Sequence, residues 1–190
     1  MSTTVTTNAL DLTPGTYAPD AIHSTFGFSV RYMGLTKFKA SFDDVDANLV
    51  VTDDGAATLT GVAKTESVSI RTPQQFVDHV VYGDDFLSAE DHPTITFAAS
   101  SIDVTDDGAA TVEGTLTVRG VAKPLTATGA YTPPTEDAMG TTKIAFDLTS
   151  TIDRRDWGLD WQAPLPKGGD ALAWDVDLAV NLILVVPAEA

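Results

Sequence analysis

Three histidines each lie within three residues of an aspartate, and these pairs are the first candidates for chemistry in the sequence. The pairs are Asp20 with His23, Asp78 with His79, and Asp91 with His92. Imidazole and carboxylate groups bind metal ions, and an imidazole can act as a general base. No spacing pattern indicates that the pairs converge, because they fall in a predicted loop, a predicted helix and a predicted turn. We therefore predict no metal site, and we interpret His23 and His79 as hydrogen-bonding groups that hold the helix on the rest of the fold. The third histidine, His92, is left without an assigned role.

A second polar cluster occurs in the segment IDRRDWGLDWQAPLPKGGD. Its four charged residues are Asp153, Arg154, Arg155 and Asp156. Guanidinium groups match carboxylates as bidentate donors, so we interpret this cluster as a structural corner in which Arg154 pairs with a nearby aspartate. The sequence contains neither the serine, histidine and aspartate order of a hydrolase nor a glycine-rich phosphate loop. We therefore assign no catalytic residue and predict that the protein is not an enzyme.

The composition limits the partners that the chain can have. Its 190 residues include 11 Lys and Arg against 27 Asp and Glu, which gives a formal net charge of −16. Such a charge repels nucleic acids and anionic lipid surfaces. No stretch approaches the roughly 18 apolar residues of a membrane-spanning helix, and the absence of cysteine excludes disulfides and thiolate ligands. Because residues 1–17 lack the basic and apolar regions of a secretory signal, we expect a cytoplasmic protein with no stable membrane insertion.

Alternating apolar and polar residues predict strands along nearly the whole chain. Residues 26–32 are the clearest example, because Phe26, Phe28, Val30 and Tyr32 share one face of an extended strand. Further strands are expected at residues 38–42, 47–51, 59–68, 95–97, 102–104, 112–118, from 125, 144–152 and 174–182. We expect residues 1–13 to form a flexible amino-terminal segment and residues 14–187 to form a single domain.

Two turns and one helix interrupt the strands. The sequence VTDDGAAT occurs twice, at residues 51–58 and 104–111. An Asp-Gly pair between alternating segments predicts a β-hairpin, because glycine supplies the positive φ that such turns require. Between residues 72 and 92 the apolar residues take helical spacing, and Pro73 suits the first turn of a helix, so one short helix is expected there.

About eight strands joined by short connections predict an all-β, antiparallel barrel, because closure hides the edges of a sheet. A barrel of this size is either filled by side chains or holds one slender ligand. The phenylalanines with inward parity are Phe26, Phe28, Phe38, Phe42, Phe97 and Phe146. The three tryptophans, Trp157, Trp161 and Trp174, either line an entrance or plug the end of the barrel as core.

Four motifs resemble those of the YceI family, the lipocalin-like polyisoprenoid-binding proteins of bacteria. They are GTYAPDAIHSTFGFSVRYMG, FVDHVVYGDDFLSAEDHPTITF, VEGTLTVRGVAKPLT and IDRRDWGLDW, in this order over residues 15–186. The sequence departs from the family pattern at Tyr32, where many members have His, and at Trp157, where Phe is more common. The resemblance implies an elongated lipocalin-like barrel of eight strands with a helix near one end. It also implies a lumen that binds an isoprenoid quinone, a prenyl alcohol or a similar amphiphile.

We therefore predict a non-enzymatic binding or carrier protein that holds an isoprenoid or similar long-chain amphiphile and requires no cofactor. The predicted ligand contacts are Phe26, Phe28, Val30, Tyr32, Phe38, Phe42, Phe97, Leu116, Val118, Phe146, Trp157 and Trp161. The alternative is a solid-core barrel that acts through a protein partner on its surface. A hydrolase or isomerase that uses His79 with Asp78 is the weakest hypothesis. Whether two barrels pair as a homodimer is left open.

Overall fold

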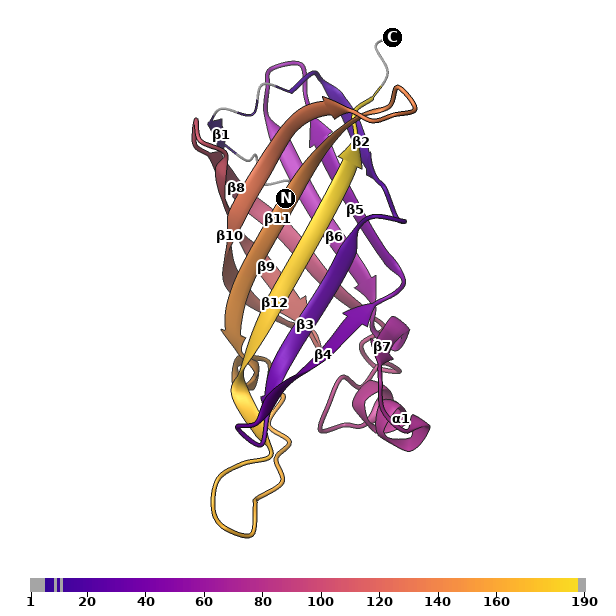
Figure 1. Ribbon diagram of the computed structural model, residues 1–190, viewed down its shortest axis with the longest axis vertical. Helices are drawn as coiled ribbons and strands as arrows, with labels where there is room; N and C mark the ends of the chain where they lie inside the picture. Colours follow the sequence, from indigo (N-terminus) through magenta and orange to yellow (C-terminus); the bar gives the residue numbers. More distant parts are fainter. Residues whose placement is uncertain (1–5, 9, 11, 188–190) are drawn as a thin grey trace.

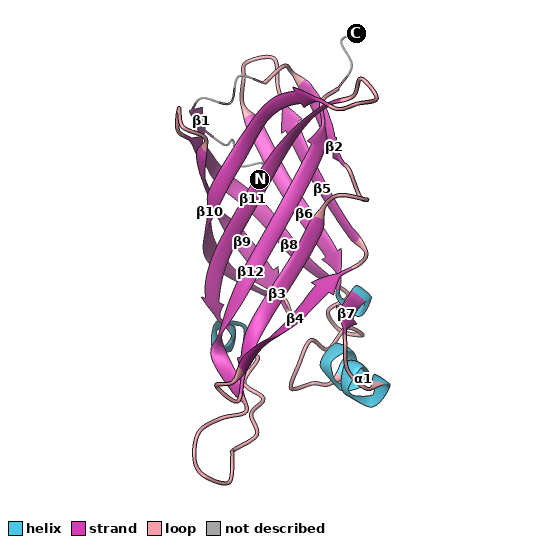
Figure 2. Cartoon of the chain, in the orientation of Figure 1, coloured by secondary structure: helices cyan, strands magenta, loops and turns pink. Residues whose placement is uncertain are grey.

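Strands make up most of the computed structural model, which describes residues 6–8, 10 and 12–187 (Figure 1 and Figure 2). The strands are β1 (Thr6–Asn8), β2 (Gly15–Pro19), β3 (Thr25–Tyr32), β4 (Thr36–Phe42), β5 (Val45–Val51), β6 (Ala57–Lys64), β7 (Val68–Ile70), β8 (Thr94–Val104), β9 (Ala109–Val118), β10 (Val121–Glu136), β11 (Thr142–Asp153) and β12 (Leu172–Val185). The helical elements are α1 (Gln74–Tyr82) and the 3-10 turns η1 (Thr65–Ser67) and η2 (Arg154–Trp157). The predicted all-β, lipocalin-like antiparallel barrel with one short helix is confirmed.

Eight strands form a closed antiparallel ring in the order β12, β11, β10, β9, β8, β6, β5, β2 and back to β12. The short strand β2 completes the ring. On it, Tyr17 lies opposite Leu49 of β5, and Pro19 lies opposite Leu184 of β12. Closure leaves no free edge at this end of the sheet, which removes a template for aggregation.

The other end of the barrel has a different wall. There β12 exchanges its partner β2 for β3, and the sheet continues through β4 to β7. Figure 1 shows α1 beside β7 at this lower end, and it shows the loop between η2 and β12 hanging below the barrel. The two ends therefore differ in construction, since one is a closed ring and the other is completed by a helix and loops.

The elements differ from the sequence-based prediction in several places. The expected strand at 59–68 is divided by η1 into β6 and β7, and the strands expected at 95–97 and 102–104 form one strand, β8. The strand expected from residue 125 is β10, which continues as far as Glu136. A register shift between Thr132 and Thr135 accommodates this extension. Strand β2 was not predicted.

The expected flexible segment 1–13 is only partly covered by the structure. Within it, β1 pairs in parallel with β8, opposite Ser101, Ile102 and Asp103. Leu12 packs against the core of the barrel. Whether the segment is flexible stays a prediction. Residues 1–5, 9 and 11 of this segment lie outside the described residues.

The two copies of VTDDGAAT form matching hairpins. Gly55 and Gly108 have φ angles of 81° and 84°, as turns of this kind require. In the first copy the Thr52 amide donates to the Ala56 carbonyl at 2.8 Å, and the second copy repeats this hydrogen bond at 2.9 Å. The predicted hairpins are therefore confirmed, and the two identical sequences adopt the same turn conformation between different pairs of strands.

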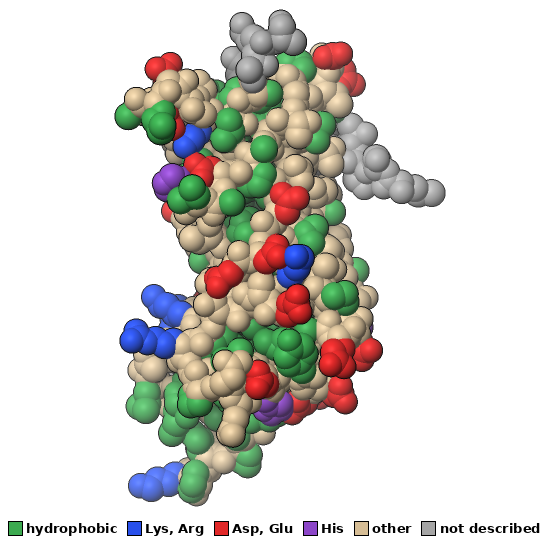
Figure 3. Space-filling view, turned by 90° about the vertical axis from the view of Figure 1, so that its right-hand side faces the viewer, with side chains coloured by type: hydrophobic (Ala, Val, Ile, Leu, Met, Phe, Trp, Pro, Cys, Tyr) green, Lys and Arg blue, Asp and Glu red, His purple; other side chains and the backbone are tan. Residues whose placement is uncertain are grey.

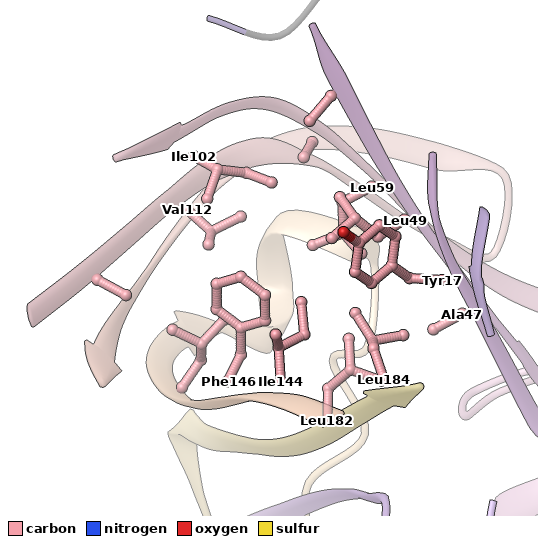
Figure 4. Packing of buried hydrophobic residues seen from close by; sticks show 14 of the residues in the cluster. Tyr17, Ala47, Leu49, Leu59, Ile102, Val112, Ile144, Phe146, Leu182 and Leu184 are labelled. Carbon is pink, nitrogen blue, oxygen red and sulfur yellow. The ribbon is translucent and has the colours of Figure 1, made fainter. Parts of the chain in front are cut away.

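A solid hydrophobic core fills the closed end of the barrel (Figure 4). Its largest fully buried side chains come from β2, β5, β8, β9, β11 and β12: Tyr17, Leu49, Ile102, Val112, Ile144, Phe146 and Leu184. The Tyr17 hydroxyl donates to the Thr13 carbonyl at 2.9 Å, which satisfies the one polar atom that this ring carries into the core. Side chains from opposite walls meet here, so this half of the barrel is a packed core.

Candidate functional site

The other half of the barrel contains an apolar cavity of about 670 Å³. Its lining residues come from β3 to β12 and from α1, together with the segments that follow α1 and η2. The volume lies within the range of about 300–1,000 Å³ that is typical of small-molecule sites. Tyr32, which is 44% exposed, belongs to the lining, so the cavity reaches the surface beside the turn between β3 and β4.

The floor of the cavity is the surface of the packed core that faces the helical end. Five residues belong both to the core at the closed end and to the cavity lining: Ala47, Leu59, Val112, Leu148 and Leu182. A chain that enters from the helical end therefore meets a closed bottom part-way along the barrel. The barrel is solid in one half and hollow in the other.

Ten of the twelve predicted contact residues line this cavity. They are Phe26, Phe28, Val30, Tyr32, Phe38, Phe42, Phe97, Leu116, Val118 and Trp161. The strand residues among them point inward because side chains alternate between the two faces of a strand. Contact between these residues and a ligand stays a prediction.

The structure places Phe146 and Trp157 outside the cavity. Phe146 is 1% exposed and packs in the closed-end core, where its ring lies 5.1 Å from that of Tyr131. Trp157 is 3% exposed, and its Nε1 donates to the Leu116 carbonyl at 3.3 Å. Phe146 has the inward parity that was expected, but it lies beyond the floor, within the packed core. Trp157 is a core residue whose indole joins η2 to β9.

Several lining residues were not predicted from the sequence. Phe76 and Val80 reach the cavity from α1, and Phe86 and Leu87 reach it from the segment that follows the helix. The helical spacing of Phe76 and Val80 predicted the helix itself. It did not predict that this apolar face would close a cavity, because that depends on where the helix docks.

Aromatic rings join the elements that surround the mouth. Phe86 lies 5.2 Å from Trp161 and 6.4 Å from Phe76, and Phe76 lies 6.4 Å from Phe38. These rings come from the loop after η2, the segment after α1, the helix and β4. Figure 3 shows hydrophobic side chains gathered at this lower end of the molecule. The entrance is therefore framed by rings from four separate segments.

His79 supports this aromatic frame. Its Nε2 lies 2.9 Å from Oδ1 of Asp85, and its ring packs edge-on to Phe86 at 4.9 Å. Asp78, the expected neighbour of His79, instead accepts a hydrogen bond from Gln74 at 2.8 Å. The observed pair therefore joins α1 to the segment that follows it, and it differs from the pair on which a hydrolase hypothesis would depend.

The other histidines lie apart from His79. Nδ1 of His23 is 2.9 Å from Oδ2 of Asp20, and the His92 carbonyl accepts from the Thr65 hydroxyl at 2.6 Å. Hydrogen bonds from Lys143 and His23 lower the pKa of Asp20 well below its ordinary range. Among the described residues, no three His, Asp or Glu side chains gather at a spacing that could hold a metal ion.

Arg154 is the charged residue of the cavity lining among the residues that the structure describes. It is 6% exposed. Its Nε donates to the Ala173 carbonyl at 3.0 Å, and its Nη1 donates to the Leu159 carbonyl. The guanidinium carbon lies 4.4 Å from the centre of the Trp174 ring, a cation–π contact. Burial lowers the pKa of the Arg154 guanidinium.

The prediction that Arg154 pairs with an aspartate is wrong. Its neighbour Arg155 makes that contact instead, donating to Asp153 through Nε at 2.9 Å and through Nη2. This contact lowers the pKa of Asp153 to about 2. The η2 turn sends consecutive arginines in different directions, so one faces solvent and a carboxylate while the other enters the barrel.

These features can be compared with known proteins. A model of the YceI-like domain matches residues 17–184, which is most of the chain. The chain belongs to the YceI-like family. A UPF0312 protein of Staphylococcus aureus is 27% identical to this YceI-like chain over 158 residues, covering 83% of the chain and 90% of the relative.

Solved structures show the same YceI-like fold. A Campylobacter jejuni YCEI protein matches with a TM-score of 0.68 at 22% identity, covering 83% of this chain and 90% of that protein. A polyisoprenoid-binding domain from Saccharophagus degradans matches with a TM-score of 0.65 at 15% identity, covering 90% and 98%. Within the described part of this YceI-like chain, no helix is long and apolar enough to cross a bilayer.

Proposed function

We propose that this protein is a non-catalytic carrier that holds the apolar chain of an isoprenoid or similar amphiphile inside the barrel. The observation that carries this proposal is the cavity of about 670 Å³, walled by aromatic and aliphatic side chains and closed by a packed floor. The name of the Saccharophagus degradans relative, a polyisoprenoid-binding domain, supports the same class of ligand.

The cavity volume limits the length of chain that can be buried. At about 30 Å³ per water-sized group, a cavity of about 670 Å³ has room for roughly 20 non-hydrogen atoms, or about four isoprene units. Each buried methylene contributes about 0.8 kcal/mol, which must exceed the cost of immobilising the chain. A longer tail would have to leave part of its length at the mouth.

A barrel with a solid core throughout is less consistent with this structure. The packed residues occupy the closed end, and they stop at the floor formed by Leu59, Val112 and Leu182. A scaffold that acted only through its surface would have no need for a hollow half. Each half of the barrel then has a role, since the packed half stabilises the fold and the hollow half receives the ligand.

Native mass spectrometry of the purified protein, followed by solvent extraction, tests this proposal. Val118 is 7% exposed and lines the cavity, so Val118→Trp should fill the lumen and reduce ligand loading. Thr115→Trp is the matched control, because Thr115 is exposed on the same strand and points to the outer face. Equal loading of the wild-type protein and Val118→Trp, or no ligand even after incubation with prenyl alcohols and quinones, would contradict the proposal.

A further inference from the structure

Arg154 brings a cation to the wall of the cavity without a complete set of partners. Two of its three nitrogens donate to backbone carbonyls, those of Ala173 and Leu159. The third, Nη2, is buried and has no hydrogen-bond partner among the described residues. Arginine has donors only, so a buried Nη2 requires an acceptor from outside these groups.

Leaving this nitrogen unpaired is unfavourable. A buried donor without an acceptor costs about 1–3 kcal/mol, and more when the group is charged. The nearest carboxylate in sequence, Asp153, is engaged by Arg155. The Trp174 ring covers one face of the guanidinium, but it supplies no hydrogen-bond acceptor to Nη2. The structure therefore places at the cavity wall a guanidinium group with one donor position unpaired.

We propose that Arg154 binds the headgroup of the ligand, and that this headgroup is an anionic oxygen group, a carboxylate or a phosphate, at the end of an apolar chain. This inference rests on the proposed carrier function and specifies the chemistry of its ligand. Hydrogen bonds between a guanidinium and an anionic oxygen are roughly twice as strong as those between neutral groups. Asp153, Asp160 and Asp170 attract the guanidinium through space, but none of them accepts a hydrogen bond from Nη2. An alcohol or a quinone could accept that hydrogen bond, but it would bring no negative charge to the buried guanidinium.

The position of Arg154 gives the ligand an orientation. Arg154 belongs to η2, and its lining neighbours Leu159 and Trp161 belong to the loop that frames the mouth. The floor, with Leu59 and Leu182, lies at the far end of the cavity. A headgroup at Arg154 therefore directs its tail toward the floor. The other polar side chains of the lining are neutral: Tyr32, Thr60, Thr72 and Thr96.

Three probes with the same twelve-carbon chain test this proposal on the wild-type protein after lipid removal: dodecanoate, dodecyl phosphate and dodecan-1-ol. We expect at least one anionic probe to bind about tenfold or more tightly than the alcohol, as a charged hydrogen bond requires. Which anion binds more tightly distinguishes a fatty-acid source from a phosphate source. Alcohol binding as tight as that of both anions would overturn the headgroup assignment while leaving the carrier function intact. If none of the three binds, the carrier function fails together with it.

Two variants locate the effect on one side chain. Arg154→Gln should reduce anion binding by about tenfold or more and change dodecan-1-ol binding much less, because the glutamine amide can still donate one hydrogen bond to the hydroxyl group. Arg155→Gln is the control, because Arg155 is the adjacent exposed arginine, and it should retain the preference for the anion. The same loss in both variants would overturn the assignment, because it would indicate a general effect of charge.

A measurement on the wild-type protein keeps the test decisive if Arg154→Gln does not fold. Dodecanoate labelled with carbon-13 at its carboxyl group can be titrated by NMR in the complex. Contact with the guanidinium should lower the pKa of the bound carboxyl group below that of the free acid. A raised pKa would show a carboxyl group in apolar surroundings away from Arg154, and it would overturn the proposal.

Discussion

Replacing a phenylalanine by alanine should have very different costs in the two halves of the barrel. Phe146 is 1% exposed and is packed within the closed-end core. A substitution of this kind removes buried area and leaves a new cavity, so we expect Phe146→Ala to lower the free energy of unfolding by about 3–5 kcal/mol.

Phe28 provides the matched site, because it is also an inward-facing phenylalanine on a barrel strand. Its ring lines the cavity and packs on one side, where the Phe42 ring lies 5.8 Å away. Phe28→Ala enlarges a space that already exists, so the surrounding side chains lose fewer contacts. The loss of one aromatic pair and of part of the buried area gives an expected cost of about 1–2 kcal/mol.

Urea denaturation of the protein after lipid removal measures both costs, provided that the dependence of the free energy on urea stays the same among variants. The expected result is a difference of about 2 kcal/mol or more between the variants. Bound lipid must be absent, because a ligand stabilises the folded state in proportion to its concentration over its Kd. Equal costs for Phe146→Ala and Phe28→Ala would refute the description of a solid half and a hollow half.

Three further predictions concern the mouth, the closed end and a close backbone contact. Trp161→Ala should speed ligand release, measured by stopped-flow displacement, because it removes the ring that packs on Phe86 across the mouth. Lys143→Met should make the free energy of unfolding fall less steeply as the pH is lowered below 3.8. The pKa of Asp20 lies far below its ordinary value of 3.8, chiefly because of the hydrogen bond from Lys143, so the contribution to stability is present above pH 3.8 and is lost as the pH falls further. Gly129→Ala should lower the free energy of unfolding by more than about 2 kcal/mol, because its Cβ would lie 1.9 Å from the Asp147 carbonyl oxygen.

Each of these predictions has a result that would contradict it. An unchanged release rate in Trp161→Ala would mean that the ring does not obstruct the mouth. Identical acid unfolding of the wild-type protein and Lys143→Met would remove the ion pair as a source of stability at the closed end. Gly61→Ala is the control for Gly129→Ala, since its Cβ would meet other atoms at 3.9 Å or more. Similar costs at the two glycines would contradict the steric argument.

The inward residues of the long strands could be predicted from the sequence because parity is a local property. Phe26, Phe28 and Val30 share one face whatever the strand pairs with. Parity does not give depth along the barrel, however, and Phe146 shows the consequence. Its register places it opposite Leu182 and Tyr131 at the closed end, and that register depends on long-range pairing.

Two features could not be predicted from the sequence because they depend on short or irregular segments: the closure of the ring by β2 and the directions of the two arginines in η2. Strand β2 has five residues and ends in Pro19, so its periodicity is too brief to indicate that it closes the ring. In the η2 segment, Arg154 and Arg155 are adjacent arginines, and the sequence alone does not indicate which of them is buried. Their different environments follow from the direction that the turn gives each side chain, which becomes visible only in the folded structure.

The position of a bound chain tests the central claim most directly. NMR spectra of the complex with dodecanoate carrying a labelled terminal methyl group can report contacts with the methyl groups of the protein. We expect intermolecular NOEs from that terminal methyl group to Leu59, Leu148 and Leu182 on the floor of the cavity. A saturated complex whose terminal methyl group shows NOEs only to residues on the outer face of the barrel would contradict it.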